Sequence, residues 1–260
     1  MAKKRKYKPL TRKAKFRLAL VIAAGLLILA LLIGMLVMLV KGGLYLLNQI
    51  KGDHEDGSVP AVSEQIDREP DATVILDPGH GGSDGGAVAV LDGTEIAEKD
   101  IDSAVSEMVK VLLERQNIEV LLTRTEDVDM DLKERTRFAN ETGADLFVSL
   151  HCNTSEAESS VEGLECYYEV QGNKGKELAD NIMNAAKASG NIKTRELRTE
   201  MMYVVRFTDM PAALVEMGFM SNPEELKKLC RSSYQQILAD AIAEGILDTL
   251  GLGSDESAED

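Results

Sequence analysis

Two histidines and two glutamates in this chain occupy positions where chemistry is commonly done in layered α/β proteins. His80 directly follows the apolar run TVILDPG, and His151 ends the run DLFVSL. Glu216 lies inside AALVEMGF, and Glu98 opens a helical pattern after the glycine-rich loop that follows His80. Because ligands bind outside the carboxyl ends of strands in open α/β sheets, we expect these side chains to meet at one edge of a sheet.

Two imidazoles and one carboxylate are typical ligands of a catalytic zinc ion. Tetrahedral zinc with three protein ligands keeps one position open for water and polarises a substrate carbonyl. A further carboxylate nearby can take a proton from the attacking water and pass it to the leaving amine. This chemistry would use one zinc ion per domain on His80, Glu98 and His151, with Glu216 as the catalytic acid–base group. No compact HExxH motif joins the ligands, so spacing alone does not decide the assignment.

Each of these residues also has a purely structural interpretation. A histidine at a strand end can be a satisfied polar group, and Glu98 can complement the dipole of a helix N-terminus. Glu95, three residues earlier, is a rival ligand. Cys152 follows His151, but successive side chains of a strand point to opposite faces, so the two should not share one site. Glu216 is harder to explain structurally, because a carboxylate inside an apolar strand is costly to bury without a partner.

Apolar strand-like runs alternate with helical patterns between residues 73 and 251. The expected strands cover 73–76, 118–123, 145–151, 163–170, 201–207 and 212–219, and the expected helices cover 98–116, 131–143, 175–190 and one or two segments within 222–251. Asn222 suits an N-cap, with proline at the next position. The alternation predicts an α/β domain with a mixed, mostly parallel sheet flanked by helices on both faces.

The charge of the chain divides it into two unlike parts. The 260 residues carry a formal net charge of −15. Residues 1–41 contain ten Lys or Arg and no acidic residue, whereas the remainder carries 19 basic and 44 acidic residues. A domain this acidic repels a nucleic-acid backbone, so nucleic acid is not an expected partner. Three cysteines without a CxxC pair indicate neither a disulfide framework nor a zinc knuckle.

Residues 18–40 form an apolar run of 23 residues without a charge. About 20 such residues span a bilayer as a helix, and the apolar region of a cleavable signal is usually shorter. We expect a retained transmembrane helix after a basic cytoplasmic head at 1–17, since Lys and Arg favour the cytoplasmic side. An acidic linker at 41–72 would then hold the domain of 73–251 outside the cell membrane, and 252–260 would form a disordered acidic tail.

Five segments of the domain form a series: VILDPGHGGSDGGA, EKD, LLTR, DLKERTRFANETGADLFVSLHCN and MPAALVEMGFMSNPEE. In content and order, from about Thr73 to Leu250, this series resembles the zinc-dependent N-acetylmuramoyl-L-alanine amidases of bacterial cell walls. The resemblance implies a mixed-sheet α/β fold. It implies hydrolysis of the amide between the lactyl group of N-acetylmuramic acid and L-alanine of the stem peptide of peptidoglycan.

The resemblance also assigns roles to individual residues. It implies zinc on His80, Glu98 and His151, with Glu216 as the catalytic carboxylate. The family's metal glutamate directly precedes the lysine of EKD, which selects Glu98 over Glu95. Two other functions remain open at this point: a membrane-anchored module that binds peptidoglycan without cleaving it, and another zinc hydrolase of the wall, a carboxypeptidase or deacetylase.

Two features bear on how the chain differs from its family. Relatives often have asparagine four residues after the metal glutamate, where this chain has Asp102. We interpret Asp102 as a helix-capping residue or as a residue that lies behind the metal ligands. Some relatives insert a regulatory helix that blocks the zinc, but the loop 153–162 is short and polar, so we expect no such helix there.

Overall fold

The computed structural model describes residues 68–170 and 174–253. The predicted membrane helix at 18–40, the basic head, nearly all of the linker and most of the acidic tail lie outside the described residues. Within the described ranges, no helix is long and apolar enough to cross a membrane.

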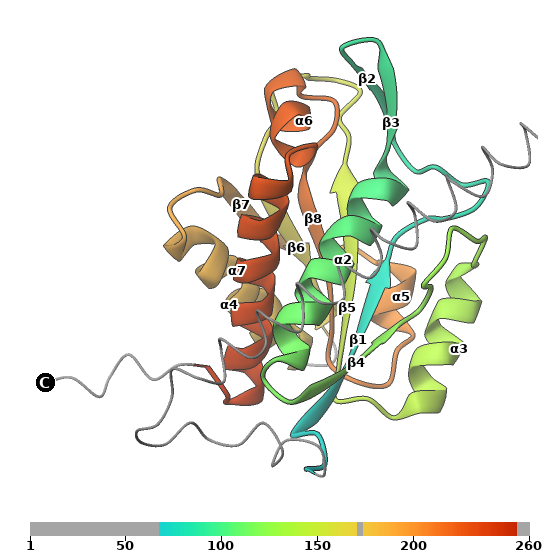
Figure 1. Ribbon diagram of the computed structural model, residues 1–260, viewed down its shortest axis with the longest axis vertical. Helices are drawn as coiled ribbons and strands as arrows, with labels where there is room; N and C mark the ends of the chain where they lie inside the picture. The colour runs from blue at the N-terminus through green and yellow to red at the C-terminus, as the bar shows by residue number, and fades with distance from the viewer. Residues whose placement is uncertain (1–67, 171–173, 254–260) are drawn as a thin grey trace, which may run out of the picture. The chain divides into compact units, whose positions relative to one another are not determined.

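A six-stranded mixed sheet forms the centre of the described part (Figure 1). In spatial order its strands are β4 (Ile118–Leu122), β1 (Ala72–Pro78), β5 (Leu146–Asn153), β8 (Ala212–Phe219), β6 (Leu164–Tyr167) and β7 (Thr194–Arg198). The first four are parallel to one another, β6 is antiparallel to β8, and β7 is parallel to β6. The carboxyl ends of β1, β5 and β8 therefore meet at one edge, as the sequence predicted.

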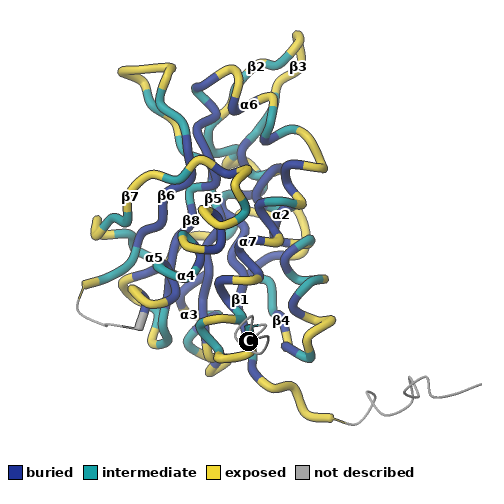
Figure 2. Tube along the Cα trace, turned by 90° about the vertical axis from the view of Figure 1, so that its left-hand side faces the viewer, coloured by how far each residue is buried: buried dark blue, intermediate teal, exposed yellow. Residues whose placement is uncertain are grey.

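Helices cover both faces of the sheet, which confirms the predicted mixed α/β class. One face carries α2 (Glu98–Glu114), α4 (Lys174–Ala188) and α7 (Ser232–Leu250), and the other carries α3 (Leu132–Thr142) and α5 (Tyr203–Arg206). Strand β1 shows the cause. Val74 and Leu76 pack into the cluster with α2, α4 and α7, whereas Ile75 between them packs into the cluster with α3 and α5. The inner strands β1, β5, β8 and β6 are accordingly buried over most of their length (Figure 2).

Local signals explain where several helices begin and end. Asp131 caps α3 by accepting from two backbone N–H groups at 2.8 Å, and Glu134 bonds back to the Asp131 N–H, which completes a capping box. Gly143 ends that helix in the left-handed conformation. As predicted, Asn222 is the N-cap of α6 (Pro223–Leu229): its side chain accepts from two backbone N–H groups, and proline occupies the first helical position.

One predicted strand is wrong. Residues 201–207 contain the short helix α5, not a strand. Its residues Val204 and Val205 are both buried against the core that contains Phe147. A strand would point two successive side chains to opposite faces, so packing both onto one core selects the helix over the β-branched composition.

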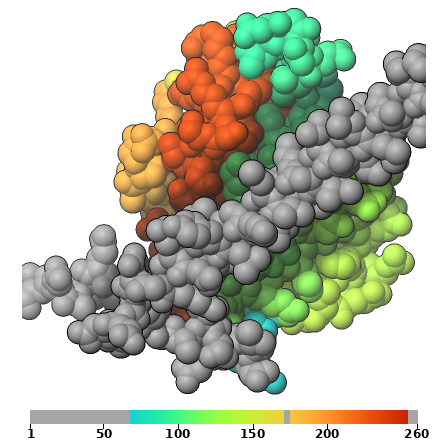
Figure 3. Space-filling model, in the orientation of Figure 1, coloured from blue at the N-terminus to red at the C-terminus, as the bar shows by residue number. Residues whose placement is uncertain are grey.

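The expected strands did not include the hairpin of β2 (Val88–Leu91) and β3 (Thr94–Ala97) or the edge strand β7. Asp92 and Gly93 at the hairpin turn have φ of 50° and 83°. A two-residue turn with positive φ at both positions is the type I′ turn for which Asp-Gly is a strong signal. The hairpin lies against α6 at the carboxyl edge of the sheet (Figure 3).

Candidate active site

His80 leaves the sheet after β1 in a left-handed backbone conformation, with φ of 56°. The glycine before it, Gly79, is required by space: a Cβ there would lie 2.3 Å from the imidazole of His151. The two imidazole rings meet edge to face, with centroids 4.9 Å apart and an interplanar angle of 82°. The turn after β1 therefore brings together two histidines that are 71 positions apart in the chain.

Two buried arginines hold this turn through its carbonyl oxygens, which belong to residues 78–80. Arg124 donates to the first two at 3.1 and 2.7 Å. Arg135 donates to the first at 2.7 Å and to the third, and it pairs with the buried carboxylate of Asp77 at 2.7 Å. The position of His80 is thus fixed by side chains from outside its own loop.

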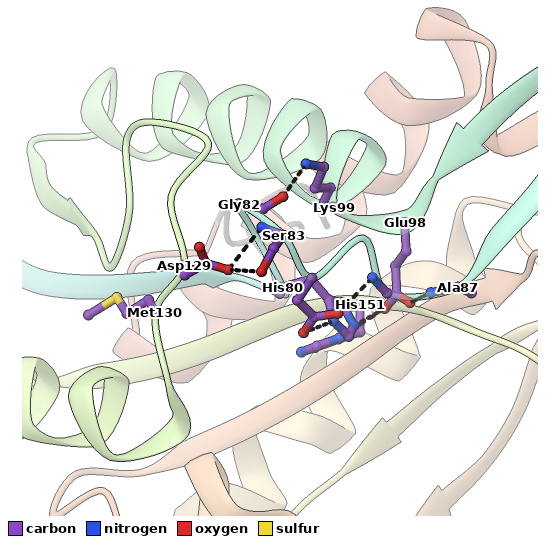
Figure 4. A network of polar contacts seen from close by, with 12 residues as sticks. His80, Gly82, Ser83, Ala87, Glu98, Lys99, Asp129, Met130 and His151 are labelled. Atoms are coloured by element: carbon purple, nitrogen blue, oxygen red, sulfur yellow. Dashed lines mark hydrogen bonds and ion pairs between the residues drawn. The ribbon is translucent and has the colours of Figure 1, made fainter.

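Glu98 is the first residue of α2, and its carboxylate lies between the two imidazoles (Figure 4). Its Oε1 is 3.0 Å from Nε2 of His80 and 2.9 Å from Nδ1 of His151. Backbone N–H groups of Cys152 and Ala87 donate to Oε1 and Oε2 at 3.1 and 2.7 Å. The carboxylate is therefore buried, and it is held by groups from the turn after β1, from the segment before β2 and from β5.

The glycine-rich loop after His80 is tied down on its other side (Figure 4). The backbone N–H and the hydroxyl of Ser83 donate to one carboxylate oxygen of Asp129 at 2.9 and 2.6 Å. Lys99 donates to the carbonyl oxygen of Gly82 at 2.8 Å. These contacts tie the loop to Asp129 and to α2.

The charges of the cluster depend on one another. Burial lowers the pKa of His80, but hydrogen bonds to Glu98 and Asp84 outweigh burial and raise that pKa to about 9. Burial raises the pKa of Glu98, but hydrogen bonds from His151 and His80 outweigh it and lower that pKa to about 2. At neutral pH the metal-free cluster thus holds a proton among ligand atoms that a cation could occupy instead.

The donor set fits a divalent metal ion. Atoms bound to zinc at about 2.0–2.1 Å in a tetrahedron are roughly 3.3 Å apart, close to the spacings around Glu98 Oε1. His80, Glu98, Asp102 and His151 each offer one ligand atom, and these atoms lie within 4.8 Å of one another. Glu95, the rival ligand, is exposed on β3 and does not belong to this cluster of described residues.

Asp102 lies in the second turn of α2, so the helix-capping interpretation is wrong; the N-cap is Ala97. The Asp102 side chain is fully buried, and neither of its oxygens has a hydrogen-bond partner among the described residues. Burial, followed by the charges of Glu98 and Glu216, raises the pKa of Asp102 well above its usual range. Its carboxylate lies within 4.8 Å of the three proposed ligand atoms, and its place behind the metal ligands stays a prediction.

Glu216 lies on β8 directly beside His151 of β5 in the strand register. Its Oε2 is buried without a hydrogen-bond partner among the described residues. Burial raises the pKa of Glu216 to about 7, with the negative charges of Glu98 and Glu165 adding to the effect and His151 opposing it. A carboxyl group with a pKa near neutrality can both accept and donate a proton.

The site contains residues to which the sequence analysis gave no role. Asp84 Oδ2 accepts a hydrogen bond from Nδ1 of His80 at 2.9 Å, and its position four residues after His80 was the available signal. Arg124 had no such signal, because it acts on backbone oxygens. Between β5 and β6, residues 154–163 contain turns and bends but no helix, which confirms that no blocking helix lies there.

Fold and cluster together define the class: an α/β domain with a possible metal-binding group at the carboxyl edge of a mostly parallel sheet. A family model described as N-acetylmuramoyl-L-alanine amidase matches residues 74–248. The chain therefore belongs to the N-acetylmuramoyl-L-alanine amidase family, whose members are enzymes that hydrolyse peptidoglycan.

Individual relatives agree with this assignment. The YqiI protein of Bacillus subtilis is 38% identical over 67% of this chain and 82% of its own length. The N-acetylmuramoyl-L-alanine amidase LytC of the same organism is 32% identical over 73% of this chain but only 38% of its own length. The crystal structure of an N-acetylmuramoyl-L-alanine amidase from Clostridium difficile 630 superposes with a TM-score of 0.67 at 32% identity, covering 71% of this chain and 98% of that one.

Proposed function

We propose that this amidase uses one zinc ion, held by His80, Glu98 and His151, to cleave the bond between N-acetylmuramic acid and L-alanine of the stem peptide. The observation that carries the proposal is the convergence of two imidazole nitrogens, of His80 and His151, on Glu98 Oε1, at 3.0 and 2.9 Å. When bound, zinc supplies Lewis-acid chemistry: it activates water for attack and polarises the substrate carbonyl.

Glu216 is the group that moves the proton. Its register beside His151 and its pKa of about 7 support this role. As a base it accepts a proton from the attacking water, and as an acid it returns that proton to the departing alanine nitrogen. Oε2 of Glu216 is free to carry this proton, since no described group forms a hydrogen bond with that oxygen.

The proposed location is the outer face of the cell membrane. The charge-free run 18–40 and the ten basic residues of 1–41 support a single span with the N-terminus in the cytoplasm. Protease added to intact protoplasts should then digest the domain and spare the head. Protection of the domain in intact protoplasts, with digestion after lysis, would contradict this location.

Product analysis tests the proposed reaction. Purified full-length chain in detergent is incubated with peptidoglycan, and the products are identified by mass spectrometry. Intact stem peptides beginning with a free L-alanine amine, together with muramic acid bearing a free lactyl carboxylate, are expected. Loss of only a terminal D-amino acid would indicate a carboxypeptidase, loss of acetyl groups a deacetylase, and binding without products a non-catalytic module. Metal content is measured on the same preparation by elemental analysis, with one zinc per chain expected.

A further inference from the structure

We propose that Arg198, supported by Arg195 and Glu165, binds a carboxylate on the stem-peptide residue that follows the cleaved L-alanine. This inference rests on the proposed function and adds to it the direction in which the substrate lies across the sheet. The site would take an anionic peptide in preference to its neutral amide.

A row of polar side chains crosses the carboxyl half of the sheet. His151 on β5 is beside Glu216 on β8, and Glu216 is directly opposite Glu165 on β6. On the next strand, β7, Arg195 and Arg198 both contact Oε1 of Glu165, at 2.6 and 3.2 Å. Each of the four neighbouring strands thus contributes a polar side chain between the proposed metal ligand His151 and the two guanidinium groups.

Glu165 is fully engaged with the protein. Its side chain is 2% exposed, and its other oxygen accepts from the Tyr167 hydroxyl at 3.1 Å. Arg195 is bound to Glu165 and its guanidinium lies 5.5 Å from the centroid of the Phe219 ring, but its side chain is 36% exposed. We therefore assign Glu165 a positioning role, and Arg195 a positioning role that leaves it within reach of substrate.

Arg198 has capacity left for a ligand. Its side chain is 37% exposed, and Nη1 makes a 3.2 Å contact with Glu200, itself 61% exposed. An exposed pair of this kind contributes little, whereas a substrate carboxylate could replace Glu200 and bind the guanidinium with two hydrogen bonds. Arg198 lines a groove of about 610 Å³ that also contains Arg195 and Glu165.

Charged side chains line both sides of the site. On the β1 side, Asp84 is paired with His80 and Asp127 with Lys99. On the β7 side, Glu162 is paired with Lys193 and Glu165 with both arginines, and Glu158 and Glu196 also line the groove. Arg195 and Arg198 are the partly exposed guanidinium groups at the end of the polar row, so a peptide whose carboxylate binds a guanidinium there extends toward β7.

The distance suits the residue after alanine. Adjacent strands are about 4.8 Å apart, so β7 is roughly 10 Å from β8. One extended residue spans about 3.5 Å, and the long arginine side chain bridges the remainder. A carboxylate two residues from the cleaved bond is thus within reach of Arg198.

The test uses two synthetic muramoyl peptides that differ only in a free carboxylate or a carboxamide on the residue after L-alanine. We expect the full-length, zinc-loaded chain to have an approximately tenfold higher kcat/KM on the carboxylate, mainly through KM, as a hydrogen-bonded charge pair at a half-exposed site would give. Arg198→Gln should reduce the preference to about one and leave the carboxamide substrate unaffected. Lys187→Gln on α4 makes the same change in net charge far along the chain and should preserve the preference.

A binding measurement separates this inference from the proposed reaction. Calorimetry with the product peptides, carboxylate against carboxamide, should show the same preference and the same loss in Arg198→Gln, with no turnover required. Equal kcat/KM for both substrates in the wild type, or a preference that survives in Arg198→Gln, would overturn the inference alone. Preferential binding without turnover of either substrate would overturn the proposed function and support the carboxylate site.

Discussion

The two ends of the polar row across the sheet are built in opposite ways. At the metal end, formed by His80, Glu98 and His151, the Glu98 carboxylate is satisfied on both oxygens and the turn after β1 is held by two buried arginines. At the peptide end, formed by Glu165, Arg195 and Arg198, both arginine side chains are more than a third exposed, and Arg198 pairs with the exposed Glu200.

This difference separates two tasks. A group that must hold a metal is rigid before the metal arrives, because each ligand atom has to be within a fraction of an ångström of its place. A group that recognises a mobile polymer keeps its donors accessible to that polymer. Glu216 lies between the ends, and its Oε2 is buried without a hydrogen-bond partner among the described residues.

The largest expected effect is at the metal end. His80→Ala and His151→Ala should each lower zinc affinity by more than the roughly 100-fold that loss of an outer hydrogen-bond partner costs. The matched control is Glu95→Ala, which removes an exposed carboxylate three residues from Glu98 and should keep its zinc. Elemental analysis after dialysis against a chelator measures this. Zinc retained in both histidine variants, or lost in Glu95→Ala, would contradict the ligand assignment.

Next in size is the effect at the middle of the row. Glu216→Gln should keep the fold and the zinc but lower turnover of a muramoyl peptide by about 10²–10⁴-fold, since the amide can neither accept nor return the proton. Glu177→Gln, on the surface of α4, is the control for a lost carboxylate. If Glu216→Gln loses zinc together with activity, Glu216 is a ligand; near-normal turnover would remove it from the mechanism.

The arginine clamp should matter for stability. Arg135→Met leaves the buried carboxylate of Asp77 without its ion-pair partner, and breaking a buried pair in this way costs about 3–5 kcal/mol. The control is Arg137→Met, two positions along the same helix with an exposed side chain. Urea unfolding of both variants gives the free energies. A loss under about 1 kcal/mol for Arg135→Met would mean that the clamp does not hold the turn.

The smallest expected effect is the number of protons that metal binding displaces. The pKa of His80 is raised from 6.5 to about 9, so its contribution to the stability of the metal-free fold is complete below about pH 6.5 and is lost as pH rises through 9. The pKa of Glu98 is lowered from 4.5 to about 2, so its contribution is present above 4.5 and is lost as pH falls through 2. Both contribute between about pH 4.5 and 6.5.

Metal binding at pH 7 should therefore displace about one proton, because a protonated imidazole cannot bind metal. Calorimetric titration with zinc in two buffers of different ionisation enthalpy counts this proton. The His80→Ala variant should release none at any zinc concentration that still binds. A wild-type titration without proton release would show that His80 is neutral in the metal-free chain.

The metal end could be read from the sequence because apolar runs stop at chemically capable side chains. TVILDPG before His80 and DLFVSL before His151 mark buried parallel strands whose ends must meet. The peptide end could not be read in this way. Strand β7 has the sequence TRELR, in which the only apolar side chain is one leucine, so no period-2 pattern marks it.

Two further features were out of reach for related reasons. Arg124 and Arg135 donate hydrogen bonds to backbone carbonyl oxygens of the turn. Every residue has such an oxygen, so no residue type in the sequence marks these contacts. The helix α5 has a β-branched composition, and only its packing against the α3 face overrides that preference. The β2–β3 hairpin, in contrast, carried a readable Asp-Gly turn.

The left-handed backbone of His80 affects how this position can change in evolution. A residue other than glycine costs roughly 1–2 kcal/mol in this conformation, so the backbone by itself favours glycine at position 80. The ion pairs of the imidazole with Glu98 and Asp84 offset this cost while His80 is protonated. In a descendant that no longer needed catalysis, substitution of His80 by glycine would relieve the backbone but would leave the buried Glu98 carboxylate without one of its partners. Residues 80 and 98 should therefore change together when a lineage turns such a domain into a binding module, which makes the pair a marker for separating active members from inactive ones.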